Sequence, residues 1–520
     1  MAELKTHKSR IGKGLINMLM FQMYGDEKLI YREYVQNARD AINDAVNHGI
    51  LGAITDGRIS ITIDSAKRFI EIRDNGIGIP VERVESVLLD IADSNKDGES
   101  SAGQFGIGRL VGGYFCKKLS FRTTYKGEEF ASEIVFDIDK IKAILNDEND
   151  KRDATDVIDS ASSRNLYDEN KDDHYFIVTL CNIDLQYPAL LNKDIIADYL
   201  REVAPVDYSF RNQLIMTSVS GEYEELQKNV GYFPISINGT AIEKRYGLRV
   251  VGTNDTINGL EYFSLKDDTY GLLAWGWYAL TDFTKAIPVS DTSSQFRLRK
   301  HNIQVGEADM LTTYFPRNET RGNKYFYGEI HIANQKIKLN SARDGLAPTP
   351  EAECLKCLIR NFFDGLVKLY HLANDTKKAV ERYIDAYKII QAPATENIVN
   401  AQKQLTDACK KLKSITKSKN ATNPVAQKVL ESYKRRIKDL HTEMDQEIPC
   451  IPASELPISS PIPQVEPELD DFEILNNHYP EDLAALIRRV CMSYQRNCPV
   501  SHIKLIRELQ RKAIRELIEE

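Results

Sequence analysis

Three short motifs near the N-terminus constrain this chain more than any other feature. Each is built from acidic, amide or glycine residues. They are Glu33-Tyr-Val-Gln-Asn37-Ala-Arg-Asp40, then Asp74-Asn-Gly76-Ile-Gly78, then Gly103-Gln-Phe-Gly106-Ile-Gly108. Read singly, they are compatible with a surface helix, a turn and a flexible loop, so their order and their chemistry have to be considered together.

The first motif lies within 27–47, a stretch with helical periodicity. Spacings of four and seven residues place Glu33, Asn37 and Asp40 on one face of that helix. One amide oxygen together with phosphates can complete the shell of Mg2+, while a neighbouring carboxylate can accept a proton from an attacking water. A solvated helix face would show the same pattern, so this motif alone does not decide the function.

The second motif directly follows a strand-like run, 69–73. Gly76 and Gly78 let the backbone pass close to a planar ligand, and Asp74 offers an acceptor for an exocyclic amine. A hairpin turn is the alternative, because Asn-Gly is also the strongest turn dipeptide.

The third motif is rich in glycine and precedes a helical segment. Its backbone N–H groups would be free to face phosphate oxygens, with the N-terminus of the helix adding a favourable dipole. It is not a P-loop, because it lacks the Gly-Lys-Ser/Thr ending, and it lacks the βαβ context of a Rossmann fingerprint. A phosphate-binding lid is the remaining interpretation.

In this order and at these separations, the motifs resemble the GHKL ATPases, specifically their heat shock protein 90 branch. The similarity includes GLINMLMFQMYGDEKLIYREYVQNARDA around the first motif, IADSNK after the second, and GQFGIG itself. It therefore covers nearly all of the first 125 residues. The resemblance implies a Bergerat α/β sandwich that holds ATP and Mg2+.

The resemblance also implies roles for individual residues. Glu33 would orient or deprotonate the attacking water, Asn37 would bind magnesium, and Asp74 would bind the adenine amino group. Other residues expected at the nucleotide are Asp40, Gly76, Gly78, Lys96, Gly103, Gln104, Phe105, Gly106, Ile107 and Gly108.

A second catalytic residue is implied farther along the chain. Leu339-Asn-Ser-Ala-Arg343-Asp-Gly resembles the family's middle-domain loop, which sends an arginine to the γ-phosphate. Arg343 would then stabilise the charge of the transition state. The alternative is a surface arginine beside Asp344.

The sequence departs from the family in three places. Only six residues, Asp97 to Ala102, separate IADSNK from GQFGIG, which indicates a simpler lid. Asp173-His174 stands where the family usually has Gly-Thr before a strand, so the resemblance does not extend to the water-mediated adenine contact made there. Beyond about residue 375, nothing resembles the chaperones' dimerisation domain.

Patterning along the chain predicts an α+β protein with several units. The expected parts are a GHKL domain at 1–215, an α/β middle domain at 216–375, a basic helical region at 376–447, a Pro-rich linker at 448–471 and a small helical module at 472–520. Strands are expected near 59–63, 69–73, 119–124 and 175–180, and Asn238-Gly239 predicts a hairpin. The polar stretch 146–173 is expected to be a surface excursion that buries no core.

Composition narrows the class of protein. With 42% hydrophobic and 28% charged residues, the chain reads as a soluble cytoplasmic protein, and its eight scattered Cys read as reduced thiols. Cys354 and Cys357 form one CxxC without a second pair, so core packing is favoured over zinc. No run approaches the roughly 20 apolar residues that span a bilayer. The net charge of −8 argues against a protein that binds nucleic acid over its whole surface.

The leading hypothesis is an ATP-driven clamp in which ATP binding closes the lid, docks Arg343, and joins two protomers through their N-terminal domains to act on a protein client. An alternative is a MORC-like or DNA-repair-like clamp on nucleic acid, for which 401–440 offers eleven Lys or Arg against three acids. Another is a non-hydrolysing ATP-binding module. A sensor histidine kinase is disfavoured, because there a helical dimerisation segment normally precedes the ATP domain.

Overall fold

A computed structural model defines the fold. It describes residues 11–18, 20, 26–90, 108–209, 222–246, 257, 259–281, 283, 285–288, 294–340, 344–391 and 398–445. The chain divides into two compact units, Met1–Asp445 and Gln446–Glu520. All described residues belong to the first unit, so the predicted linker at 448–471 and the predicted helical module at 472–520 lie outside them.

The first part of this unit is an eight-stranded sheet with the order β5-β4-β3-β6-β2-β1-β7-β8. All neighbours pair antiparallel except β1 and β7, which are parallel. The strands are β1 Ile59–Asp64, β2 Phe69–Asp74, β3 Lys118–Thr124, β4 Phe130–Asp137, β5 Ser162–Asp168, β6 Tyr175–Cys181, β7 Ile235–Ile237 and β8 Thr240–Ala241. The four strands expected from the sequence in this region are therefore confirmed.

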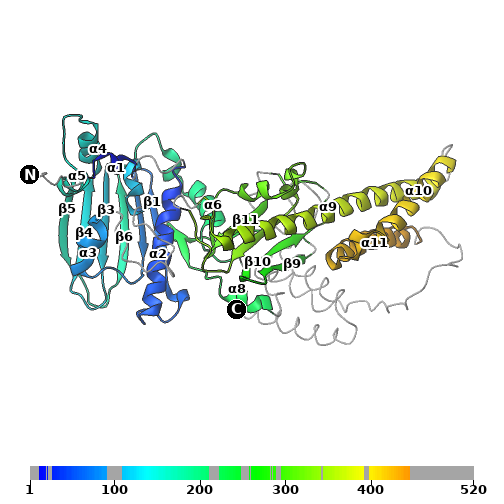
Figure 1. Ribbon diagram of the computed structural model, residues 1–520, viewed down its shortest axis with the longest axis horizontal. Coiled ribbons are helices and arrows are strands. Elements are labelled where there is room, and N and C mark those ends of the chain that lie inside the picture. The colour runs from blue at the N-terminus through cyan, green and yellow to red at the C-terminus, as the bar shows by residue number, and fades with distance from the viewer. Residues whose placement is uncertain are drawn as a thin grey trace, which may run out of the picture. The chain divides into compact units, whose positions relative to one another are not determined.

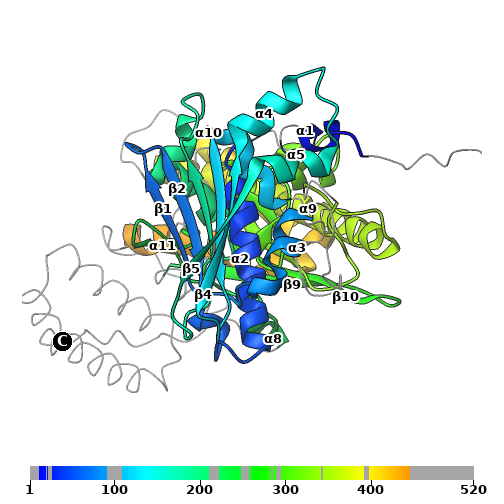
Figure 2. The ribbon, with the colours of Figure 1, turned by 90° about the vertical axis from the view of Figure 1, so that its left-hand side faces the viewer.

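Helices cover one face of this sheet (Figures 1 and 2). Strand alternation explains which face: in β1 the isoleucines Ile59, Ile61 and Ile63 are buried, while Ser60 and Thr62 between them are exposed. The helices are α1 Gly14–Asn17, α2 Leu29–Asn47, α3 Val84–Leu89, α4 Ile138–Asn146, α5 Ala154–Ala161 and α6 Lys193–Val203. Short 3-10 helices are η2 Ile54–Asp56, η3 Val81–Arg83, η4 Gly108–Phe115 and η5 Pro188–Leu191.

The expectation for 146–173 was wrong. Asp153 caps α5 by accepting a hydrogen bond from the backbone of Asp156, and α5 buries Val157 and Ile158 in the core. The following residues form β5, which pairs along its full length with β4. A few apolar residues at helical spacing were enough to fix a polar stretch to the sheet.

The hairpin predicted at Asn238-Gly239 is present, with both residues at positive φ between β7 and β8. It adds to the first sheet, because β7 pairs with β1 and buries Ile235 and Ile237 in the first core. The domain boundary near residue 215 stays a prediction, but the first sheet also contains β7 and β8, which follow that residue in the chain.

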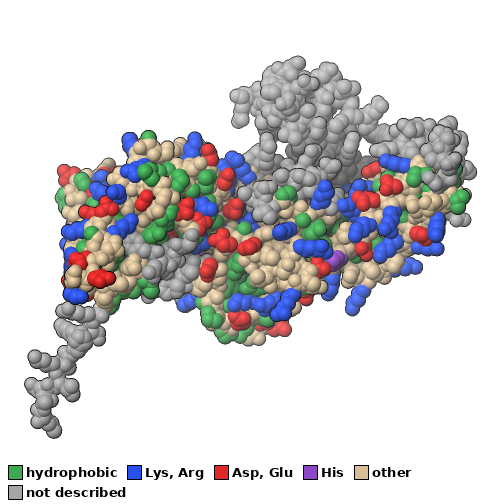
Figure 3. Space-filling view, turned by 90° about the horizontal axis from the view of Figure 1, so that it is seen from above, with side chains coloured by type: hydrophobic (Ala, Val, Ile, Leu, Met, Phe, Trp, Pro, Cys, Tyr) green, Lys and Arg blue, Asp and Glu red, His purple; other side chains and the backbone are tan. Residues whose placement is uncertain are grey.

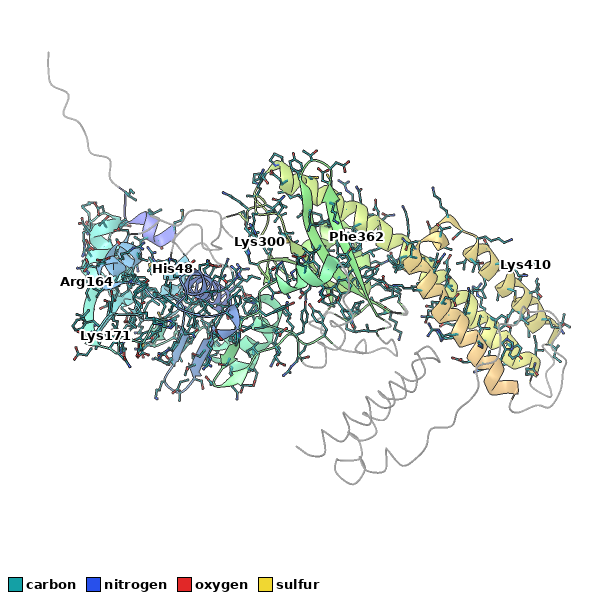
Figure 4. All side chains as sticks on the ribbon, turned by 90° about the horizontal axis from the view of Figure 1, so that it is seen from below. His48, Arg164, Lys171, Lys300, Phe362 and Lys410 are labelled. Atoms are coloured by element: carbon teal, nitrogen blue, oxygen red, sulfur yellow. The ribbon has the colours of Figure 1, made fainter. Side chains whose placement is uncertain are left out.

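A second sheet has the order β12-β11-β13-β10-β9. Its strands are β9 Gly259–Asp267, β10 Gly271–Leu280, β11 Gln295–Lys300, β12 Ile303–Gln304 and β13 Tyr327–Ile332. The helix α8, Glu222–Lys228, and the 3-10 helices η6 Met310–Tyr314 and η7 Thr320–Tyr325 belong to the same part of the chain. The long helix α9, Pro350–Gln391, packs on this sheet through Phe362, whose ring stacks on Phe263 at 4.0 Å (Figure 4).

Two further helices pack against α9: α10 Ile398–Thr416 and α11 Pro424–Asp445, with η8 Lys419–Thr422 between them. A helical region is therefore present, as predicted, but α9 already begins at Pro350, so the predicted boundary between 375 and 376 falls inside one helix. Lys and Arg side chains are frequent on the surface of this region (Figure 3). Cys354 and Cys357 both lie on α9, and in the described part of the chain no group of three His, Cys, Asp or Glu residues could hold a metal ion. No helix among the described residues is long and apolar enough to cross a membrane. Together the two sheets and the helical region confirm the α+β class.

Candidate functional site

The first motif lies on the helix α2, most of whose side chains are buried against the first sheet. Tyr31 and Tyr34 hold the helix in place: the Tyr31 hydroxyl donates to the carbonyl of Leu190 at 2.7 Å, and the Tyr34 hydroxyl donates to the carbonyl of Arg109 at 2.9 Å. Glu33 is 1% exposed, whereas Asn37 is half-buried. A buried carboxylate and a more accessible amide thus share one face of the helix, as the spacing predicted.

Charged neighbours on α2 balance these carboxylates. The Arg32 guanidinium lies 3.5 Å from Glu33 Oε1, and the Arg39 guanidinium donates to Asp40 Oδ1 at 2.9 Å. All four side chains are buried. Burial of a carboxylate is unfavourable unless it is paired, so these arginines make the acidic stripe compatible with the core. Asp40 keeps its place on the predicted face, and its contact with a nucleotide stays a prediction.

Asp74 ends β2 and is 4% exposed. Its Oδ1 accepts a hydrogen bond from the backbone N–H of Gly76 at 2.8 Å. Burial raises the pKa of Asp74 from its ordinary value to about 7, and the hydrogen bond and the Arg73 charge only partly oppose that rise. A carboxylate in such surroundings is well suited to accept a hydrogen bond from a neutral ligand amine.

The glycines of the second motif are required by close backbone approaches. A Cβ at Gly76 would lie 2.6 Å from the backbone of Ala41 on α2, and the adjoining Ile77 N–H donates to the Ala41 carbonyl at 2.9 Å. Gly78 has a φ of +71°, and a Cβ there would lie 1.9 Å from the Thr124 carbonyl oxygen. The motif is therefore a tight loop pressed between α2 and β3, and the alternative of a hairpin turn is excluded, since β2 pairs next with β6 and β1.

Two residues that sequence reasoning did not assign also hold this loop. Thr123 Oγ1 accepts from the Ile79 N–H at 2.9 Å and donates to the Tyr175 carbonyl at 2.9 Å. His174 Nδ1 lies 2.9 Å from the Gly76 carbonyl oxygen. His174 is one of the two residues noted as a departure from the family, and the departure was the only signal in the sequence that pointed to it.

The third motif is described only from Gly108, where η4 begins. The Gly112 N–H donates to the Tyr34 hydroxyl at 3.0 Å, which ties η4 to α2. The segment after the motif was expected to be helical and is a 3-10 helix. Lys96 and the lid residues Gly103, Gln104, Phe105, Gly106 and Ile107 lie outside the described residues, and their roles stay predictions.

Arg343 also lies outside the described residues, but both flanks of its loop are described. Leu339 forms an isolated antiparallel bridge with Leu346, and the Asn340 N–H donates to the Gly345 carbonyl at 3.0 Å. The Asn340 side chain donates to Asp344 Oδ1 at 2.6 Å. The residues on either side of 341–343 thus lie next to each other.

The candidate site residues are spread along α2. The Asp74 loop contacts the helix at Ala41, and Glu33 lies eight residues earlier, which is about 12 Å along the helix axis at ~1.5 Å per residue. Asp74, whose pKa is raised, and Glu33, which is paired with Arg32, are thereby separated along one helix. Asn37 lies between them as an oxygen donor suited to Mg2+, which needs few protein ligands when phosphates and waters complete its shell.

Part of the chain matches a known protein family. Residues 29–164 match the family described as histidine kinase-, DNA gyrase B- and HSP90-like ATPase. This part of the chain is a GHKL-type ATPase domain. The matched range runs from the first residue of α2 into β5, so it contains Glu33, Asn37, Asp74 and all three motifs.

Similar curated proteins come from bacteria. The chaperone protein HtpG of Halalkalibacterium halodurans is 32% identical over 133 residues, which cover 22% of this chain and 21% of HtpG. HtpG of Shewanella baltica is 30% identical over 161 residues, covering 26% and 24%, and HtpG of Nitrobacter winogradskyi is 32% identical over 125 residues, covering 21% and 20%. The chain thus spans between a fifth and a quarter of the relatives it matches, and the likeness is to an HSP90-like ATPase domain.

Proposed function

We propose that this protein binds Mg-ATP along α2 and hydrolyses it, and that the cycle drives an HSP90-like clamp. One observation supports the proposal: within a domain that matches the ATPase family, Glu33 and Asp74 are both buried, and the loop after Asp74 contacts α2 eight residues from Glu33. Asp74 accepts the adenine amino group, and the tight loop of Gly76 and Gly78 lets the base approach the backbone.

At the phosphate end, Glu33 orients the attacking water and accepts its proton. The Arg32 guanidinium, 3.5 Å from Glu33 Oε1, stabilises the buried Glu33 carboxylate and fixes its orientation. Magnesium, when bound at Asn37, neutralises phosphate charge. Arg343, from the loop closed at Leu339 and Leu346, supplies positive charge to the γ-phosphate.

We further propose that ATP closes the lid at 103–108, brings two protomers together through their ATPase domains, and acts on a protein client. The curated relatives are named chaperones, which favours a protein client over a nucleic acid at 401–440. Suppression of the aggregation of a denatured test protein, in the presence of ATP and lost in Glu33→Ala, is the expected sign of that action. A cytoplasmic location stays a prediction.

The test of hydrolysis is the steady-state turnover of Mg-ATP by the purified chain, by Glu33→Ala and by Arg343→Ala. Loss of a base or of a charge-stabilising arginine should lower turnover by roughly two orders of magnitude or more while ATP affinity is retained. Glu85→Ala is the matched control, because Glu85 is an exposed helical glutamate of the same domain, and its carboxylate lies 3.2 Å from Arg164 Nε at the surface. Tight binding with no turnover in the wild type would leave a binding module instead.

A further inference from the structure

A buried charged cluster in the second sheet lies apart from the nucleotide residues. Its centre is Glu329 on β13, which is fully buried. Glu329 Oε1 accepts from Arg299 Nε at 2.6 Å and from the Tyr246 hydroxyl at 2.7 Å, and Lys244 Nζ lies 3.1 Å away. Oε2 accepts from the Tyr208 hydroxyl at 2.5 Å and lies 3.1 Å from His331 Nε2.

The cluster joins two stretches of chain that the sheet alone would not join. Tyr208, Lys244 and Tyr246 come from segments that flank the hairpin of the first sheet, whereas Arg299 and Glu329 belong to the second sheet. Burial alone would raise the pKa of Glu329, but the Arg299 and Lys244 charges hold it well below its ordinary value. A buried carboxylate with this many donors fixes the relative position of the segments that supply them.

Arg299 extends the cluster to α6. Its Nη2 donates to the carbonyl of Glu202 in the last turn of that helix at 2.8 Å, and its Nη1 donates to the Asn302 carbonyl at 3.2 Å. The last carbonyls of a helix lack partners inside the helix and carry its negative dipole, so a guanidinium is a favourable anchor there. Arg297 lies nearby, 3.8 Å from the Glu202 carboxylate.

α6 also contacts α2, the helix that carries Glu33. α6 packs against α2, and the Lys28 ammonium at the start of α2 lies 5.3 Å above the Tyr199 ring. Arg32 follows Lys28 by one helical turn, so the ring of Tyr199 on α6 lies beside the part of α2 that carries the Arg32–Glu33 pair. α6 is therefore a strut between the Glu329 cluster and the Arg32–Glu33 pair.

We propose that Glu329 and Arg299 are positioning residues for hydrolysis, which clamp α6 and through it fix the Arg32–Glu33 pair on α2. This inference rests on the proposed ATPase function. It concerns turnover only, because the contacts of Glu329 and Arg299 lead through α6 to the Arg32–Glu33 pair and not to the Asp74 loop, where the base is proposed to bind. Displacement of a reacting group by about 1 Å can lower a rate on the order of 10²-fold, so even a small shift of α6 should be measurable.

The first variant is Glu329→Gln, which keeps the size of the side chain and removes the charge. Its matched control is Glu319→Gln, because Glu319 also accepts hydrogen bonds from a tyrosine and a histidine, Tyr370 and His371, but both of these lie on α9. We expect turnover at saturating Mg-ATP to fall about tenfold or more in Glu329→Gln, with an ATP Kd within about twofold of the wild type. Glu319→Gln should retain both.

A second variant guards against loss of folding, since Glu329→Gln leaves Arg299 and Lys244 buried without their counter-charge. Arg299→Lys keeps the positive charge, but a single ammonium cannot reach the Glu329 carboxylate and the Glu202 carbonyl together as the guanidinium fork does. It should show the same split between turnover and Kd. It should also accelerate hydrogen exchange at the C-terminus of α6 and in α2.

The outcomes separate the two proposals. If Glu33→Ala abolishes turnover but Arg299→Lys and Glu329→Gln hydrolyse ATP like the wild type, the positioning role is wrong and the ATPase stands. If the wild type does not hydrolyse ATP, the proposed enzyme is wrong, and hydrogen exchange decides the coupling by itself. Unchanged exchange in α2 of Arg299→Lys would then overturn it.

Discussion

Asp74 is a buried carboxylate whose surroundings favour its neutral form, and this links the candidate site to stability. Its pKa is about 7 in the folded chain against an ordinary value near 3.8. The stabilisation that comes with its raised pKa is complete below pH ~3.8 and is lost as pH rises through about 7. At pH 8 the folded protein therefore holds an unfavourable buried charge. Such a residue is expected where a ligand later provides the missing partner.

Replacing Asp74 should show how much stability its buried charge costs the folded protein. We expect Asp74→Asn to be more stable than the wild type at pH 8, on the order of 2–4 kcal/mol, with the difference vanishing towards pH 4. Denaturant unfolding at several pH values without nucleotide measures it. Glu71→Gln is the control, since Glu71 lies on the same strand but on the opposite face. A variant that is less stable than the wild type at pH 8 would contradict the assignment of burial as the cause.

Gly78 provides a second prediction at this scale. Gly78→Ala should destabilise the domain by about 3 kcal/mol or more, because its Cβ would lie 1.9 Å from a carbonyl oxygen in addition to the strain of its positive φ. Gly127 also has a positive φ, yet nothing lies within 4 Å of a Cβ there. Gly127→Ala should therefore cost only about 1–2 kcal/mol. Equal losses, measured by thermal unfolding, would mean that the close approach at Gly78 is not what requires glycine.

The sequence indicated the candidate polar residues of the site but not the residues that contact and support them. Local patterns, helical spacing and an acid at the end of a strand, were enough to identify Glu33, Asn37 and Asp74 as candidates. Thr123 and His174 were not assigned, because their contacts with the Asp74 loop depend on β3 and β6 lying side by side in the sheet. Contacts of this kind come from long-range register, which local patterns do not encode.

Among the elements, α5 shows how little apolar surface fixes a polar segment. Ile158 is 2% exposed, so Ile158→Ala should destabilise the domain by about 2–5 kcal/mol. Leu166 on the neighbouring β5 is 56% exposed, and Leu166→Ala should have an effect below about 0.5 kcal/mol. Chemical denaturation of both variants checks the prediction. A negligible loss in Ile158→Ala would support the original expectation that 146–173 buries no core.

Elements near in sequence were predicted better than elements joined at long range. The hairpin of β7 and β8 was predicted from Asn238-Gly239, since the turn chemistry is contained in two residues. Its addition to the first sheet by parallel pairing with β1 was not, because more than 170 residues separate Ile59 from its partner Ile235. The helical character of 376–447 was predicted from the sequence, whereas its division into α9, α10 and α11 was not.

For the whole molecule, the account predicts that nucleotide changes assembly. ATP should favour a dimer joined through the ATPase domains, and Glu33→Ala, which binds ATP without hydrolysing it, should accumulate that dimer. Analytical ultracentrifugation with ATP, with ADP and without nucleotide measures the populations. Asp74→Asn, which should bind ATP roughly 10²-fold more weakly, is the control, at an ATP concentration that saturates only Glu33→Ala and the wild type. Identical sedimentation of Glu33→Ala in all three conditions would contradict the proposed clamp cycle.

The central claim is that one nucleotide lies along α2, with its base at Asp74 and its γ-phosphate at Glu33. The most direct test is calorimetric titration of Mg-ATP into the wild type, Glu33→Ala and Asp74→Asn, with turnover measured on the same preparations. The account predicts that Glu33→Ala binds like the wild type without turning over, whereas at pH 8, where Asp74 is ionised, Asp74→Asn loses roughly 10²-fold in affinity, as loss of a hydrogen bond to a charged group should give. Wild-type affinity in Asp74→Asn, or wild-type turnover in Glu33→Ala, would place the nucleotide elsewhere.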